Sequence, residues 1–266
     1  MEKFELNGNS TTNILTTPLV VCEFDVSDSL PHVTREVDKS ISGRYKKPNF
    51  YGVKSEEPLI LMTSLVKENG EYFSMQERHE VEYWLKKNEL PTAMKCTDKN
   101  GEYCFFDVVV TDIKWNIVGA RVIGANISFE CSGNGCYKLA SARYTTAGTY
   151  TLDIKSSEKY IYPRINLKNN NSSKTTITIK TNGKSMPIEA PSGKTLILDT
   201  EYMVIGTGET YSQLGFDKLK TINWPYFVSG KNVVEIDGNN FELELHYKLY
   251  NYGLGSYFGD IGDIGK

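Results

Sequence analysis

Four of the five cysteines are the residues whose type could hold a metal ion. Seven residues separate Cys96 from Cys104, and four separate Cys131 from Cys136. Structural zinc is held in short, paired knuckles, and these two spacings together do not match that pattern. An odd number of cysteines also does not suit a secreted disulfide framework. We therefore expect reduced thiols in a chain made in a cytosol, and no metal site.

The three histidines could act as general bases, but none has the neighbours that catalysis needs. His32 lies in a polar stretch, His79 on a helical segment and His246 on the polar face of a strand-like segment. No serine or cysteine elbow and no metal-ligand spacing accompanies any of them. We expect no catalytic residue and no cofactor. A glycosidase remains an alternative, because a catalytic carboxylate pair is defined by its separation in space.

Aromatic side chains are the other residues with a chemical use, since the chain has 17 tyrosines and 3 tryptophans. Sugars stack on exposed aromatic rings, so Trp224, Tyr226 and Tyr250 are candidate sugar contacts. Alternatively, large aromatic residues such as Trp224, Phe227 and Tyr247 fill the core of a β-sandwich. Exposed tyrosines are equally at home in protein interfaces. These interpretations remain open at this point.

The charge balance gives no reason to expect strong attraction to polyanions. The 266 residues include 30 basic and 33 acidic side chains, for a net charge of −3. Neither specific nucleic-acid binding nor an anionic membrane surface is therefore expected. No run of 18 apolar residues occurs and the first residues are polar, so we expect neither a membrane span nor a signal peptide. Proteins or sugars are the expected partners.

One segment, Ser74 to Asn88, has the pattern of an α-helix. Ser74 and Glu77 can form a capping box at its start. Val81, Trp84 and Leu85 follow at spacings that place them on one face. We expect this face to anchor the helix on a β-sheet, with Trp84 making the largest contact.

Strand-like segments surround this helix in the first half of the chain. The run 58–67 is apolar on both faces, which is typical of a central strand. The Asn100-Gly101 pair predicts a hairpin between 93–97 and 102–112. In 19–26 the alternation predicts a core-facing set of Val20, Cys22, Phe24 and Val26. In 121–131 it predicts an inward set of Ile123, Ala125, Ile127, Phe129 and Cys131.

A polar and basic segment, 31–52, interrupts these strands and is predicted to be a long loop. Its Ser42-Gly43 and Pro48-Asn49 pairs are typical of turns. Long loops in compact domains usually have a function. Arg44, Lys46 and Lys47 are therefore candidate contact residues between subunits of an assembly.

A glycine-containing stretch after residue 132 divides the chain into two expected domains. Gly133 and Gly135 mark a linker, 133–137, between a first domain of 1–132 and a second of 138–266. The second domain has short alternating strands separated by turn clusters, which is the pattern of a β-sandwich or jelly roll. The expected fold class is mainly β, with a β-sandwich-like first domain that carries one α-helix.

The order of these features resembles that of the distal tail proteins of long-tailed phages. The features are a strand ending in Leu6-Asn7-Gly8, the basic segment at Ser42-Gly43-Arg44, the helix with Trp84-Leu85, the Asn100-Gly101 hairpin, and the closing strand 127–131 with Tyr137 after it. The run Trp224-Pro225 through Gly230-Lys231-Asn232 to Glu235-Ile236 is similar to the galectin-like sandwich of these proteins. Gly133-Asn134-Gly135 departs from the serine-proline step of many relatives.

The resemblance implies a structural protein that catalyses no reaction. Six copies would form a ring at the virion tail tip, assembled in the bacterial host cytoplasm. The ring would join the tail tube protein to the tail-associated hub protein and to a receptor-binding protein. Unpaired sheet edges that pair around a cyclic axis give a physical motive for such a ring.

DNA would pass through the lumen of that ring, so we expect the basic loop at Arg44 to face a neighbouring protein instead. The competing hypothesis is a carbohydrate-binding adhesion module that contacts host cell-wall polysaccharide.

Overall fold

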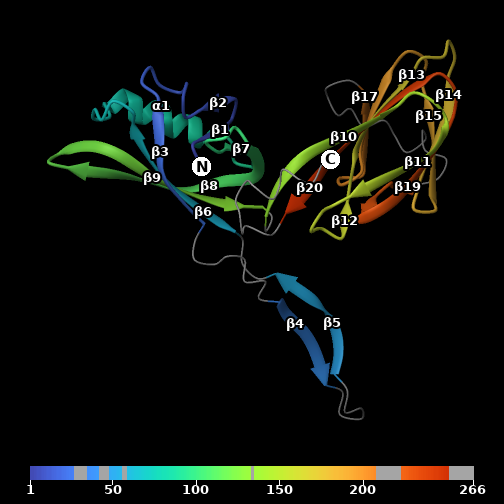
Figure 1. Ribbon diagram of the computed structural model, residues 1–266, viewed down its shortest axis with the longest axis horizontal. Coiled ribbons are helices and arrows are strands. Elements are labelled where there is room, and N and C mark those ends of the chain that lie inside the picture. The colour runs from blue at the N-terminus through green and yellow to red at the C-terminus, as the bar shows by residue number, and fades with distance from the viewer. Residues whose placement is uncertain (27–34, 42–47, 56–58, 133–134, 208–222, 252–266) are drawn as a thin grey trace. The chain divides into compact units, whose positions relative to one another are not determined.

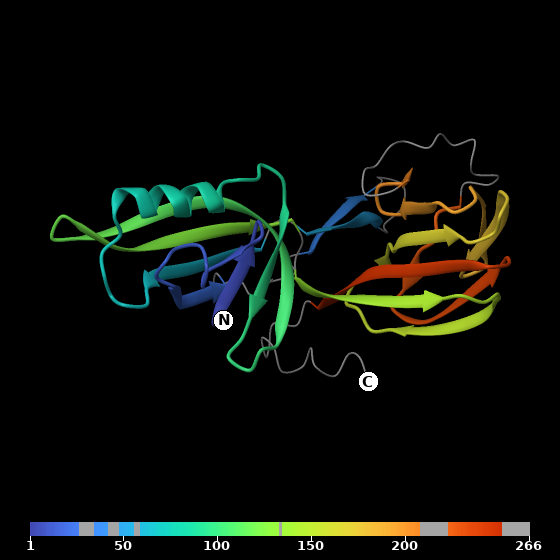
Figure 2. The same cartoon turned by 90° about the horizontal axis from the view of Figure 1, so that it is seen from above.

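The structure is a computed structural model that describes residues 1–26, 35–41, 48–55, 59–132, 135–207 and 223–251. The chain divides into two compact units, whose described parts are Met1–Cys136 and Tyr137–Asn251. Both units are built of β-strands, and α1 is the one helix in these ranges (Figures 1 and 2). The predicted mainly β fold class with a single helix is thus confirmed. No helix in the described ranges is long and apolar enough to cross a membrane.

A twisted sheet forms the framework of the first unit. Its strands are β1 (Lys3–Leu6), β2 (Asn9–Ser10), β3 (Leu19–Val26), β6 (Ile60–Lys67), β7 (Thr92–Thr97), β8 (Tyr103–Val118) and β9 (Arg121–Cys131). β3, β6, β9 and β8 lie side by side in antiparallel register. β8 is long enough for two partners, because residues 103–108 pair with β7 and residues 108–118 with β9. The central position predicted for 58–67 is confirmed.

Helix α1 (Met75–Leu85) packs on one face of this sheet, and its start has the predicted capping box between Ser74 and Glu77. Its three buried residues are Val81, Trp84 and Leu85. The Trp84 ring stacks on Phe4 with centroids 5.4 Å apart. Its Nε1 donates a hydrogen bond of 2.6 Å to the carbonyl oxygen of Leu6. The helix is therefore joined to β1 by both packing and a polar contact.

A buried ion pair ties the first turn of α1 to the end of β6. Lys67 is 5% exposed, and its Nζ lies 2.6 Å from Oε1 of Glu77. Partial burial opposes ionisation of Glu77, but the hydrogen bond from Lys67 and those from Ser74 outweigh it, so the pKa of Glu77 is lowered below 4.5. The carboxylate of Glu77 therefore joins the helix start to both Lys67 and the backbone N–H of Ser74.

Glu77→Gln should make the protein less stable at pH 7 and less sensitive to acid. A carboxyl group with a lowered pKa in the folded state stabilises the fold above its ordinary pKa and loses that contribution as the pH falls through the lowered value. We expect a loss of about 1 kcal/mol at pH 7, discounted for partial exposure. Urea unfolding between pH 7 and pH values below 4.5 measures it, with the exposed Glu89→Gln as control. Parallel pH profiles of wild type and Glu77→Gln would contradict the assignment.

The core face predicted for β3 is wrong at its first residues. Leu19 is buried, whereas Val20 is 39% exposed and Cys22 is exposed. Val21 lies opposite the buried Leu65, so the odd-numbered residues face the core until a β-bulge after Val21 shifts the register. Residues 19–22 are all apolar, so the alternation of apolar and polar residues could not show which face of the strand is buried. The side chains of Phe24 and Val26 lie outside the described residues.

β9 shows a second effect of a β-bulge. Ala125, Ile127, Phe129 and Cys131 are buried as predicted, but Ile123 is 37% exposed. Asn116 and Ile117 of β8 pair with Gly124 and Val122, so Ile123 is the extra, unpaired residue of a β-bulge in β9 itself. The regular alternation expected from the sequence does not allow for such an extra residue.

Glycine has a steric role next to that bulge. A Cβ on Gly124 would lie 2.8 Å from the carbonyl oxygen of Leu65, so no other residue fits without a backbone shift. At the hairpin end, Gly119 and Ala120 have φ values of 55° and 64°. Positive φ at both central residues is the geometry of a type I′ turn, which suits a two-residue hairpin loop. A tight two-residue turn therefore joins β8 to β9.

The loop predicted over 31–52 is wrong in part. β4 (Arg35–Ile41) and β5 (Pro48–Ser55) pair as an antiparallel hairpin. The prediction failed because these residues lack the apolar alternation of a strand. A hairpin is joined by backbone hydrogen bonds, which do not require that pattern. Arg44, Lys46 and Lys47, between the two strands, lie outside the described residues.

The second unit is a β-sandwich, as predicted. One sheet has the order β17-β16-β13-β20-β10, the other has the order β11-β19-β14-β15, and β12 pairs with β18. The strand bounds are β10 (Cys136–Tyr144), β11 (Gly148–Ile154), β12 (Tyr160–Ile161), β13 (Arg164–Asn169), β14 (Thr175–Thr181), β15 (Lys184–Ala190), β16 (Thr195–Asp199), β17 (Val204–Thr207), β18 (Phe227–Val228), β19 (Gly230–Asp237) and β20 (Phe241–Asn251). Alternate residues of both sheets, such as Ile165 on β13 and Ile179 on β14, share one buried core.

Candidate functional site

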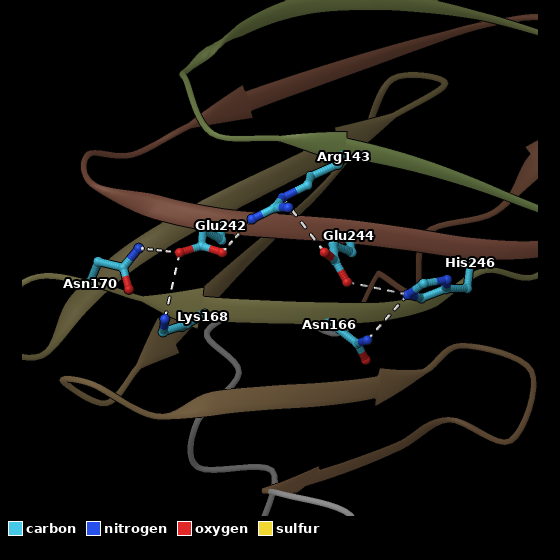
Figure 3. A network of polar contacts seen from close by, with 7 residues as sticks. All are labelled: Arg143, Asn166, Lys168, Asn170, Glu242, Glu244 and His246. Atoms are coloured by element: carbon cyan, nitrogen blue, oxygen red, sulfur yellow. Dashed lines mark hydrogen bonds and ion pairs between the residues drawn. The ribbon is translucent and has the colours of Figure 1, made fainter.

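Seven polar side chains form a connected network on the outer side of the β13–β20 sheet (Figure 3). We call this network the polar face, and its members are Arg143, Asn166, Lys168, Asn170, Glu242, Glu244 and His246. The alternation of β13 and β20 produces it, because Ile165, Leu167, Leu243 and Leu245 point into the core. The residues between them must therefore point outward.

Glu242 is the centre of one half of the polar face. Its Oε1 accepts a hydrogen bond of 3.0 Å from Asn170 Nδ2, and its Oε2 accepts one of 2.8 Å from Arg143 Nη2. Lys168 Nζ lies 3.5 Å away. The amide of Asn170, the guanidinium of Arg143 and the charge of Lys168 together lower the pKa of Glu242. This carboxylate is thus held ionised and oriented.

His246 marks the other end of the polar face. Its Nε2 lies 3.2 Å from Asn166 Nδ2 and 3.6 Å from Glu244 Oε2 (Figure 3). Oδ1 of Asn166 has no hydrogen-bond donor within the described ranges. On the neighbouring strand β13, Arg164 pairs with Asp199 of β16 on one side and with His246 of β20 on the other. Polar groups from three strands are therefore brought into one row.

A pocket of ≈ 760 Å³ adjoins this row. Its walls contain five tyrosines, so we call it the tyrosine pocket; they are Tyr160, Tyr162, Tyr202, Tyr247 and Tyr250. Arg164, Asn166, Asp199, Glu201 and His246 contribute polar groups to it. A volume between about 300 and 1,000 Å³ is typical of small-molecule sites. Its mixed lining could bind a ligand that has both apolar faces and hydroxyl groups.

The exposed tyrosines of the pocket come from different elements. Tyr160 belongs to β12, Tyr162 follows that strand, and Tyr202 lies in the turn between β16 and β17. The Tyr226 ring contacts Tyr160 edge to face, with the ring centroids 5.5 Å apart. Burial raises the pKa of Glu158, another lining residue.

Four of the five cysteines lie in the core of the first unit, and the described ranges contain no candidate metal site. No group of three histidine, cysteine or acidic residues there is placed to hold a metal ion. Cys96, Cys104, Cys131 and Cys136 are buried. Burial and neighbouring acidic groups raise the pKa of Cys131 to about 12, so this thiol stays protonated. Protonated, buried thiols are packing residues rather than nucleophiles.

The sequence-based candidates are placed as follows. Tyr250 lines the tyrosine pocket, Tyr226 contacts one of its walls, and Trp224 packs against the sandwich core. Gly133 lies outside the described residues, and Gly135 directly precedes β10. The sequence interpretation missed the other pocket tyrosines and the polar face. The alternating polar residues of β13 and β20 were a signal, but their pairing was not visible in the sequence.

The first unit has two long strand edges that form the second candidate surface. β3 pairs with β6, and residues 112–118 of β8 pair with β9. Within the described strands, the opposite edges of both have no partner. Such edges present a row of unpaired N–H and C=O groups that another strand can bind. Head-to-tail pairing between copies is therefore open to this unit.

The sheet face opposite α1 mixes polar side chains with exposed apolar ones such as Met62 where it can be described. Asn126 Oδ1 accepts hydrogen bonds from Ser64 Oγ at 2.9 Å and from Asn116 Nδ2 at 3.0 Å. Lys114 Nζ and Asp112 Oδ2 form an ion pair of 3.1 Å. The three strands β6, β9 and β8 thus carry no basic cluster on this face in their described residues.

Comparison with known proteins identifies the first unit. Residues 1–133, half of the chain, match the family described as Phage tail protein N-terminal domain. None of the curated proteins is significantly similar in sequence.

Solved structures with a similar fold come from phages. The crystal structure of SPP1 Dit (gp 19.1), described as a paradigm of the hub adsorption apparatus in phages that infect Gram-positive bacteria, has a TM-score of 0.62 at 11% identity, covering 94% of this chain and 99% of that chain. The phage P2 baseplate in its activated conformation with Ca has a TM-score of 0.53 at 8% identity, covering 92% of this chain and 96% of that chain. At such identities the likeness shows a shared fold.

Proposed function

Since the chain belongs to the phage tail proteins that share this N-terminal domain, we propose that it is a structural, non-catalytic component of the tail tip, in which six copies form a ring. The observation that carries the proposal is the pair of unpartnered strand edges on the first unit. β3 of one copy would pair with residues 112–118 of β8 in the next. Such a head-to-tail contact closes into a ring when its rotation closes.

The chemistry of the sheet face opposite α1 supports the ring. In this arrangement the face with Ser64, Asn116 and Asn126 would line the lumen, because α1 occupies the other side. DNA must slide through such a lumen without being held. A wall of amide, hydroxyl and apolar side chains, with one internal ion pair and no basic cluster in its described part, does not bind phosphate strongly.

The partners follow from the position of a ring at a tail tip. We propose that one rim contacts the tail tube protein and the other contacts the tail-associated hub protein. The second unit would then be available to a receptor-binding protein or to the host surface. The protein would be assembled in the host cytoplasm and would act in the virion. Arg44, Lys46 and Lys47 would contact a neighbouring protein and not the lumen.

The mass of the purified protein in solution tests the ring directly. Multi-angle light scattering should give about 180 kDa, six times the chain mass of 30.0 kDa. Negative-stain images should show a six-fold ring with an open centre. A two-fold symmetric dimer would contradict the proposal.

Variants at the strand edge show whether the proposed contact closes the ring. Ile117 and Val118, near the end of β8, are exposed. Replacing both with Glu should shift the mass to that of the monomer, because charged side chains on an edge strand disfavour its pairing with another strand. Tyr83→Glu, on the exposed side of α1, is the control and should leave the mass unchanged. If the double variant had the same mass in solution as Tyr83→Glu, the contact between copies would not involve this edge of β8.

A further inference from the structure

The tyrosine pocket takes no part in the contact between copies that we propose for the ring. We propose that it binds a neutral oligosaccharide of two to three sugar units. The proposal goes beyond the structural role, because the pocket lies entirely within the second unit and needs no neighbouring copy. Ring formation and sugar binding can therefore fail separately.

The aromatic lining is the first argument. A pyranose has one face of C–H groups, and an aromatic ring with a negative π-face is a suitable partner for it. Tyr160, Tyr162 and Tyr202 are 45%, 44% and 74% exposed, so their rings are available to a ligand. A single exposed ring is common on protein surfaces, but three around one pocket form a platform with several stacking positions.

The polar lining is the second argument. Sugar hydroxyls both donate and accept hydrogen bonds, and planar side chains with fixed geometry recognise them best. Asn166 and His246 are oriented by their 3.2 Å contact, and Arg164 and Asp199 occupy the same row across the strands. The pocket therefore offers polar groups that the strands hold in fixed positions.

The charge of the lining selects a neutral ligand. Glu158, Asp199 and Glu201 supply three carboxylates. Arg164 and Lys248 supply two cations, and Nζ of Lys248 also lies 4.5 Å from the ring centroid of Tyr137. A polyanion would meet more negative than positive charge here, which disfavours its binding. Polymers joined by phosphodiesters are thus poor candidates, and neutral sugars fit the charge of the lining.

The full-length protein should be tested on an array of neutral oligosaccharides, followed by titration calorimetry with the best trisaccharide. We expect dissociation constants of about 0.1 to 1 mM, which is usual for a small, shallow-bound ligand. Tyr202→Ala and Tyr162→Ala should each weaken binding about tenfold. Tyr83→Ala, an exposed tyrosine of the first unit, is the matched control and should bind as the wild type does.

A second variant guards against a folding defect. Asn166→Asp keeps the shape of the side chain but removes its N–H donors, and should weaken binding about tenfold while the melting temperature stays within a few degrees. Absence of binding to every neutral oligosaccharide would overturn the proposal. Preference for a poly(glycerol phosphate) probe, or binding unchanged by both tyrosine variants, would overturn it as well.

Discussion

Trp84→Ala should lower the free energy of unfolding by about 3 to 5 kcal/mol, the usual cost of removing a large aromatic side chain from a core. Trp84 is 2% exposed and stacks on Phe4. Phe4 in turn contacts Phe129 edge to face at 5.7 Å, so the indole is one side of an aromatic cluster. The substitution also leaves the carbonyl oxygen of Leu6 without its N–H donor. The cavity and the lost hydrogen bond act in the same direction.

Tyr83→Ala is a control on the neighbouring residue, because Tyr83 is 67% exposed on the same helix. It should change the free energy of unfolding by less than about 0.5 kcal/mol, as is usual for surface positions. Urea denaturation followed by tryptophan fluorescence and circular dichroism measures both variants. Equal, small effects would mean that α1 contributes little to the stability of the first unit, against its observed packing.

Asn232→Ala should cost about 3 kcal/mol, because it leaves several buried backbone groups unpaired at about 1 kcal/mol or more each. Asn232 is fully buried. Its Oδ1 accepts a hydrogen bond of 2.8 Å from the backbone N–H of Val228, and its Nδ2 donates to the carbonyl oxygens of Val228 and Gly230 at 2.8 and 2.9 Å. This one side chain therefore holds the bend between β18 and β19.

Asn232→Asp separates packing from hydrogen bonding. It retains the acceptor for Val228 but places a carboxylate against two carbonyl oxygens, so it should destabilise the protein at least as much as alanine does at pH 7. Asn239→Ala, at an exposed position, is the control and should be nearly neutral. Thermal unfolding of the full chain measures all three variants. A neutral Asn232→Asp would show that the hydrogen bonds do not hold the bend.

Three features of the fold could be predicted because they depend on neighbours in the chain. The capping box and one-sided face of α1 depend on residues within four positions of each other. The turn at Asn100-Gly101 and the positive φ of Gly101 are also local. Alternating apolar residues and regular turns were enough to predict a mainly β chain, because successive side chains of any strand point to opposite faces. These elements carried the resemblance to distal tail proteins.

Other features were decided by pairing between distant segments. Val20 faces outward because of the register of β3 against β6, and Ile123 because it is the extra residue of a bulge in β9. A one-residue shift in register moves a side chain to the other face, and apolar residues on both faces leave that shift unmarked in the sequence. The β4–β5 hairpin was predicted as a loop because its sequence has no apolar alternation. Its strands are defined by their pairing with each other.

The sequence by itself determined a mainly β chain with one capped helix, an aromatic-rich second half and no motif for catalysis or a metal. Only the tertiary structure decided where its functional surfaces lie. Asn166 and His246 are 80 residues apart in the chain and meet because β13 pairs with β20. Tyr202 joins them through the turn after β16. Local patterns set the strands, whereas pairing across long sequence separations sets which side chains share a pocket.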